Sequence, residues 1–74
     1  MSAEIPQTLT CRVNGERLTL PAGTTIAELL QARGWAGKRV AVERNGEIVP
    51  RSLHAQTVIA EGDAIEVVVA VGGG

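Results

Sequence analysis

AIEVVVAVGGG, residues 64–74, contains the most strongly strand-forming segment of the chain. Residues 64–71 predict a β-strand, because β-branched side chains favour the extended backbone. One face of this strand carries Ile65, Val67, Val69 and Val71, and the other carries Ala64, Glu66, Val68 and Ala70. A strand that is apolar on nearly both faces is usually central in its sheet. The glycines that follow, Gly72, Gly73 and Gly74, bury nothing, so any role they have is that of a free end.

Two earlier segments predict β-hairpins that turn at Asn-Gly. Residues 9–20, LTCRVNGERLTL, alternate apolar side chains on both sides of Asn14-Gly15. Residues 40–50, VAVERNGEIVP, repeat the pattern around Asn45-Gly46 with Val40, Val42 and Ile48. Asn-Gly between alternating strands favours a type I′ turn, because both central residues tolerate a positive φ. We therefore expect two antiparallel hairpins.

The segment between the hairpins, PAGTTIAELLQARGWAG, predicts a helix from about Ile26 to Arg33. Thr25 followed by Glu28 is a capping-box pattern, which satisfies free N–H groups at the start of a helix. Gly34 favours the left-handed conformation that ends a helix. The apolar residues of this helix have the spacing of a single stripe, namely Ile26, Leu29 and Leu30. The stripe must cover one face of a sheet.

The order of these elements predicts one domain, residues 1–74, with a flexible tail over residues 72–74. Hairpin, helix, hairpin and strand follow one another, with a short helical turn expected near residues 52–55. This order is typical of an α+β domain with a mixed sheet of about five strands and one helix packed on one face. Cys11 and His54 are the only cysteine and histidine, so neither a disulfide nor a structural zinc site supports the core.

Composition and charge exclude several classes of function. The net charge is −1, whereas nucleic-acid binding needs a basic surface, and Trp35 is the only aromatic residue for base stacking. The first residues, MSAEIPQTLT, contain no apolar run typical of a signal peptide. The longest apolar run, Val67 to Val71, is far too short to cross a bilayer. We therefore expect no nucleic acid and no membrane as partners, and a cytoplasmic location, where a free thiol is ordinary.

Five motifs give the chain a resemblance to the ubiquitin-like β-grasp family. They are VNGE, GTTIAELL, VAVERNGEIVPRS, EGDAIEVV and the terminal VGGG, which together cover about residues 9–74. Within that family the chain is similar to the ThiS family, the sulfur carrier proteins of thiamin biosynthesis. The resemblance implies a β-grasp fold with a functional Gly-Gly end.

The resemblance also implies a reaction cycle at the C-terminal carboxylate of Gly74. A ThiF-like adenylating enzyme activates this carboxylate with ATP and magnesium, forming an acyl-adenylate. Sulfur from a cysteine desulfurase system converts the adenylate into a thiocarboxylate. A ThiG-like thiazole synthase then takes the sulfur into the thiazole ring of thiamin. ATP and magnesium belong to the activating partner, so we expect no cofactor and no metal bound by this chain.

Physical chemistry agrees with this cycle. A carboxylate is a poor electrophile until one of its oxygens becomes part of a leaving group, and the activating site must exclude water. Glycine suits entry into such a site because it lacks Cβ. Three extended residues span at most roughly 10 Å, so Gly72 and Gly73 have the length to carry Gly74 into a narrow channel. A glycine run alone is also typical of a disordered end; the central strand and the NGEIVPRS block favour the functional interpretation.

A docking surface is predicted on the open face of the sheet. If Val67 and Val69 face the helix, Val68 and Ala70 face outward, because side chains alternate along a strand. Ala41 on the neighbouring strand joins them, and the predicted set is Val68, Ala70, Val71 and Ala41. Small exposed apolar residues beside a reactive tail favour partner docking. The alternative is a half-exposed sheet face without a partner.

Other candidate residues have structural interpretations. Cys11 is predicted to be a small core residue whose inward side is unsuited to a persulfide relay. His54 is predicted to be a solvated loop residue. Ordinary surface charge is the interpretation for Lys38, Arg39 and Arg51.

These observations favour a sulfur carrier that serves as a co-substrate and is not itself an enzyme. Three alternatives remain open. The first is a sulfur carrier like the small subunit of molybdopterin synthase, which the short chain and the near absence of aromatic residues disfavour. The second is a ubiquitin-like protein modifier, joined through Gly74 to lysines. The third is an interaction module with an inert tail, which activity surviving removal of Gly73-Gly74 would support.

Overall fold

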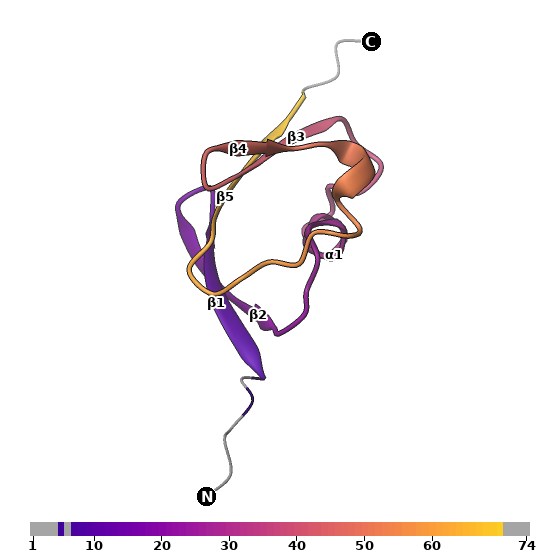
Figure 1. The fold of residues 1–74 in the computed structure, drawn as a ribbon. Coiled ribbons are helices and arrows are strands. Elements are labelled where there is room, and N and C mark those ends of the chain that lie inside the picture. The colour runs from indigo at the N-terminus through magenta and orange to yellow at the C-terminus, as the bar shows by residue number, and fades with distance from the viewer. Residues whose placement is uncertain (1–4, 6, 71–74) are drawn as a thin grey trace, which may run out of the picture.

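A computed structural model describes residue 5 and residues 7–70 of the chain. Five strands form one sheet in the order β2-β1-β5-β3-β4, and a single helix crosses one of its faces (Figure 1). β5 pairs in parallel with β1 and antiparallel with β3, so the sheet is mixed. The elements in chain order are β1 (Thr8–Val13), β2 (Glu16–Pro21), α1 (Ile26–Ala32), β3 (Val40–Arg44), β4 (Glu47–Val49), the 3₁₀ helix η1 (Arg51–Leu53) and β5 (Ala64–Val69). The predicted α+β class and the central place of the last strand are confirmed.

Both hairpins turn at the predicted Asn-Gly pairs. Asn14 and Asn45 have φ values of 52° and 51°, and the glycines after them are also in the positive region. These dihedrals are those of type I′ turns, whose twist matches that of the flanking strands. The turn chemistry therefore sets the register of β1 with β2 and of β3 with β4.

Local capping chemistry sets both ends of α1. The Glu28 backbone N–H donates to Thr25 Oγ1 at 3.1 Å, and the Thr25 backbone N–H donates to Glu28 Oε1 at 2.9 Å. These two bonds are the predicted capping box. The helix ends at Ala32, one residue earlier than predicted, and Gly34 follows with φ +76°. The single stripe of α1, which includes the buried Leu29, faces the sheet.

The core lies between α1 and the concave face of the sheet. Its buried members are aliphatic apart from one cysteine: Leu9, Cys11, Val13, Ile26, Leu29, Leu30, Val42, Ile59, Ile65 and Val67. Burying a large aliphatic side chain stabilises the fold by about 1.5–3 kcal/mol relative to exposure. The predicted inward position of Cys11 is confirmed, since its side chain is 1% exposed.

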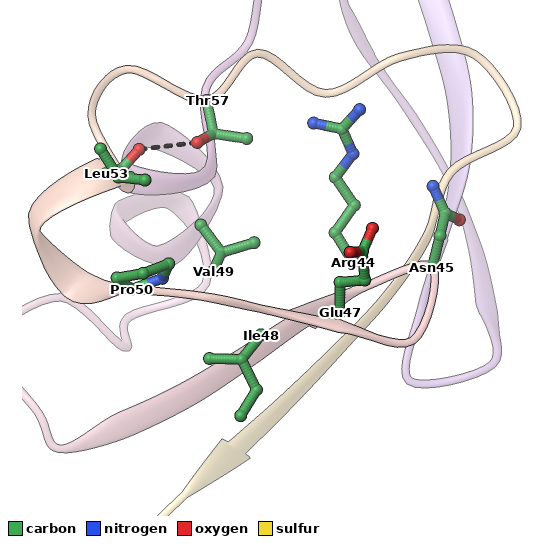
Figure 2. A pocket seen from close by; sticks show the side chains of 8 residues that line it. All are labelled: Arg44, Asn45, Glu47, Ile48, Val49, Pro50, Leu53 and Thr57. Atoms are coloured by element: carbon green, nitrogen blue, oxygen red, sulfur yellow. Dashed lines mark hydrogen bonds between the residues drawn. The ribbon is translucent and has the colours of Figure 1, made fainter.

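Ile48, which the sequence grouped with Val40 and Val42 in the alternating pattern of the second hairpin, does not lie on their side of the sheet. The two-residue turn pairs Val42 with Val49 and Glu43 with Ile48. Val49 therefore packs against the core, and Ile48 points to the opposite side of β4, where it is 74% exposed (Figure 2).

His54 is buried and not solvated, so the sequence-based expectation for this residue was wrong. Its side chain is 7% exposed, and its ring Nε2 donates to the carbonyl oxygen of Val49 at 3.0 Å. The His54 carbonyl oxygen accepts the backbone N–H of Ala27 at 2.9 Å. The ring thus joins β4 to the segment after η1, close to the helical turn that the sequence predicted.

Candidate functional site

The candidate site is built on β5, which leads the chain from the middle of the sheet toward residues 71–74. The last described residue is Ala70, which directly follows β5. The predicted reactive Gly74, the tail residues Gly72 and Gly73, and the docking residue Val71 lie outside the described residues. The structure therefore shows what holds and surrounds β5.

Asn14, in the turn of the first hairpin, holds the middle of β5. Its backbone N–H donates to the Ile65 carbonyl oxygen at 2.9 Å. Its side chain then continues the ladder: Oδ1 accepts the Val67 N–H at 2.7 Å, and Nδ2 donates to the Val67 carbonyl oxygen at 3.1 Å. β1 itself pairs with β5 only as far as Val13 with Ile65. The side-chain amide of Asn14 therefore makes the hydrogen bonds to β5 that the next residue of β1 would make if the pairing continued.

Asn45 and Asp63 hold the start of β5 in a similar way. Asn45 Oδ1 accepts the Ala64 N–H at 2.9 Å, and Asn45 Nδ2 donates to Asp63 Oδ1 at 3.0 Å. The other oxygen of Asp63 accepts the Ala60 N–H at 2.8 Å and lies 3.1 Å from Arg44 Nε. The carboxylate is 6% exposed and fully bonded, so its burial carries no unpaired-charge penalty.

The last part of β5 is held mainly along one edge. Val68 and Val69 pair with Ala41 and Val40 of β3, and the Ala70 N–H donates to the Arg39 carbonyl oxygen at 2.9 Å. In an antiparallel pair, only alternate residues of a strand bond to the partner strand. Because Ala70 bonds toward β3, the N–H and the carbonyl oxygen of Val69 point the other way, toward the side of β1. β1 does not pair with β5 at this point, because its pairing ends at Val13 with Ile65. The strand thus leaves the sheet gradually before the tail begins.

The open face of the sheet brings the predicted docking residues together. Val68 is 66% exposed and stands directly opposite Ala41, which is also exposed, as is Ala70. Sequence reasoning missed one member of this group, Ile48, which lies on the same face because it pairs with Glu43. The two-residue length of the Asn45-Gly46 turn fixes the register of the hairpin, and this register predicts that Ile48 lies on the open face. We define the apolar docking patch as Val68, Ala41, Ala70 and Ile48.

Cys11 is not part of an accessible site. Its thiol is buried, and burial raises its pKa above the usual value of 9.0, with smaller contributions from the negative charges of Asp63 and Glu61. The thiol therefore remains protonated near neutral pH and is a poor nucleophile. Lys38, Arg39 and Arg51 are exposed, as the sequence predicted.

A pocket of about 350 Å³ lies between the β3–β4 hairpin and the segment after η1 (Figure 2). Arg44 lines one end of it and is engaged by Asp63. At the other end, Thr57 Oγ1 donates to the Leu53 carbonyl oxygen at 2.7 Å. These bonds tie the loop to the hairpin, so we interpret the pocket as the junction between them. Over residues 5 and 7–70, no group of three His, Cys, Asp or Glu side chains is placed to hold a metal ion.

The sheet order, the single crossing helix and the central last strand define the ubiquitin-like β-grasp fold. The chain belongs to the ThiS family, whose model matches residues 4–74. It resembles the crystal structure of the thiamine biosynthesis protein ThiS from Geobacter metallireducens with a TM-score of 0.74 and 35% identity, over 89% of this chain and 100% of that one. The family match and the solved structure therefore agree on both the fold and the family of this chain.

Two curated relatives are thiazole synthases. The one from Paramagnetospirillum magneticum is 45% identical over 62 residues, and the one from Magnetococcus marinus is 47% identical over 62 residues. Each match covers 84% of this chain but only 19% of the relative, so this chain spans about a fifth of their length. Within the described part of the chain, no helix has the length and apolarity that a membrane crossing requires.

Proposed function

We propose that the chain carries sulfur as a thiocarboxylate on Gly74 for the formation of thiazole. A partner enzyme with ATP and magnesium adenylates the carboxylate and releases pyrophosphate. A persulfide supplied by a cysteine desulfurase system then displaces AMP to form an acyl disulfide, and attack of a thiol on the other sulfur of this disulfide releases the thiocarboxylate and leaves a new disulfide. The observation that carries this proposal is the ThiS-family match, which runs from residue 4 through Gly74 and so includes the terminal glycines.

The fold supports this chemistry by the place where β5 ends. From Ala70, four further residues span at most roughly 14 Å when extended, which is enough to reach into an enclosed partner site. Glycine at positions 72–74 leaves no side chain to obstruct entry or the approach of sulfur to the carbonyl carbon. Since the end of β5 is fixed by Ala41 and Arg39 of the neighbouring chain segment, docking of the domain aims the tail.

The proposed consumer of the sulfur is a thiazole synthase. The matched relatives carry a segment similar to this chain within a protein named thiazole synthase. A carrier-like segment in the same polypeptide supports direct contact between carrier and synthase. We propose that the apolar docking patch, together with Val71, forms this contact, and that the cycle takes place in the cytoplasm, where ATP is available and a free thiol is ordinary.

Intact-mass spectrometry tests the proposal. The protein is incubated with a thiamine-pathway adenylating enzyme, ATP, magnesium and a sulfur source. The expected result is a mass gain equal to the exchange of one oxygen for one sulfur, located at Gly74. Gly73→Val blocks the gain, whereas Gly23→Ala, a change in a loop with φ +92° and open space around the added Cβ, costs some stability and keeps it.

Two outcomes contradict the proposal. An unchanged mass with a demonstrably active adenylating enzyme and an intact C-terminus would exclude Gly74 as the acceptor. Adducts that join Gly74 to lysines of other proteins would instead support a protein modifier.

A further inference from the structure

Two carboxylates face each other on the open side of the sheet without a compensating charge. Glu43 of β3 and Glu66 of β5 are direct partners in the ladder, and both are exposed. Within residues 5 and 7–70, neither side chain is part of an ion pair. Like charges directly opposite one another destabilise a sheet. The pair therefore imposes a cost on folding that no other described residue relieves.

The acid pair lies inside the apolar docking patch. Along β5 and β3, the next pair toward the tail is Val68 with Ala41. Across the sheet, Glu43 is also the direct partner of Ile48 on β4. Two exposed large apolar side chains of this face, Val68 at 66% and Ile48 at 74%, thus border the carboxylates on two sides.

This arrangement restricts what can cover the patch. A partner surface that buries both Val68 and Ile48 also removes water from Glu43 and Glu66. Enclosing two carboxylates without a counter-charge is strongly unfavourable, whereas a charge-assisted bond to each of them recovers the loss. A guanidinium group has donors enough, in a planar fork, to bond both carboxylates at once.

We propose that the open face recognises its protein partner through the Glu43–Glu66 pair, and that this partner, the thiazole synthase, places an arginine or lysine side chain over the two carboxylates. This inference rests on the proposed function, because it assigns the docking partner named there. The apolar patch supplies area, and the acid pair sets the specificity and the register in which the domain docks. The apolar patch alone would bind a neutral apolar surface, but the two carboxylates disfavour such a partner because it leaves them buried without a counter-charge.

The same face provides a matched control. Arg12 and Arg17 are also direct partners, in the β1–β2 ladder, and both are exposed. Arg12 aligns with Ala64 at the start of β5, at the end of the sheet remote from Ala70. The arginine pair is therefore also a pair of like charges in direct register, but it lies outside the apolar docking patch.

The test compares Glu43→Gln, Glu66→Gln and the double variant with Arg17→Gln. Binding to a thiazole synthase whose own chain lacks a ThiS-like segment is measured by calorimetry at low and high salt, and thermal unfolding is measured in parallel. Each Gln variant should weaken binding about tenfold and reduce its salt dependence. All of the variants, Arg17→Gln included, should raise the unfolding midpoint by about 2 °C, because each relieves a like-charge pair. Arg17→Gln should leave the dissociation constant unchanged.

Several results would overturn the inference. The proposed cationic partner surface is refuted if the double variant binds the synthase as tightly as the wild-type chain or more tightly. It is also refuted if the wild-type chain does not bind the synthase. A wild-type dimer in sedimentation that Glu43→Gln and Arg17→Gln both dissociate shows that a second copy covers the face, with its arginine pair over the acid pair. If the thiocarboxylate still forms in these cases, the proposed function stands; if it never forms, the proposed function fails as well.

Discussion

Replacement of Asn14 by glycine or alanine separates the two tasks of this turn residue. Its side chain bonds both the N–H and the carbonyl oxygen of Val67, at 2.7 and 3.1 Å, and its backbone has φ 52°. Asn14→Gly keeps the positive φ and loses the two side-chain bonds. Asn14→Ala loses the bonds and also places a Cβ in the left-handed region, where alanine is strained.

The expected magnitudes follow from those two losses. Each partly buried hydrogen bond contributes about 1 kcal/mol net, so Asn14→Gly should destabilise the fold by about 2 kcal/mol. The left-handed backbone adds about 1 kcal/mol, which brings Asn14→Ala to about 3 kcal/mol. For a small domain with a total stability of about 5–15 kcal/mol, either loss is a large fraction.

Urea unfolding followed by the fluorescence of Trp35 measures both variants, since Trp35 is the only tryptophan and packs against the core. With a slope of about 1–2 kcal/mol per molar urea, Asn14→Gly should lower the midpoint by about 1–2 M. Amide exchange should also quicken at Val67 before it does so at Val42 of β3, which pairs with Val49 of β4. An Asn14→Gly protein within 0.5 kcal/mol of wild type, with slow Val67 exchange, would refute the anchoring role.

Three further predictions concern the docking face, the core cysteine and the buried histidine. Val68→Asp should weaken synthase binding at least about tenfold in calorimetry and change stability by under about 1 kcal/mol, because Val68 is exposed; unimpaired binding would contradict docking there. The pKa of the Cys11 thiol is raised above 9.0, so above that pH the unfolded chain loses its proton first and stability falls. Urea titrations from pH 8 to 11 should show a shallower decline in Cys11→Ala, and equal slopes would refute the argument. His54→Leu should cost about 1–3 kcal/mol in the same assay, because it leaves the Val49 carbonyl without its donor; a neutral change would show that the bond is dispensable.

Local chemistry is what the sequence predicted well. The positive φ values of Asn14 and Asn45 follow from side chains that tolerate the left-handed region. The Thr25–Glu28 box lies within one turn of helix, so its bonds need no tertiary information. The central place of β5 follows from apolar residues on both of its faces. In each case the partners are near in sequence, or the pattern itself reports burial.

What the sequence did not predict depends on distant partners. The burial of His54 depends on the carbonyl of Val49 and the helix N-terminus at Ala27, which the fold brings together. The bonds of Asn14 to Val67 join residues 53 positions apart, and no periodic pattern encodes them. Ile48 is a different case, because counting back from the Asn45-Gly46 turn would have paired Val42 with Val49. That error came from reading alternation without the register.

Support along β5 is unequal, and this bears on the proposed carrier chemistry. Asn45 bonds its first residue and Asn14 bonds Val67, so the two hairpin turns hold the strand from both sides over residues 64–67. From Val68 onward, the paired neighbour is β3, and side chains of the open face are exposed. A partner that docks on this face therefore contacts β5 where its own sheet supports it least. Because the anchored half does not need to move, docking on this face does not require the domain to unfold.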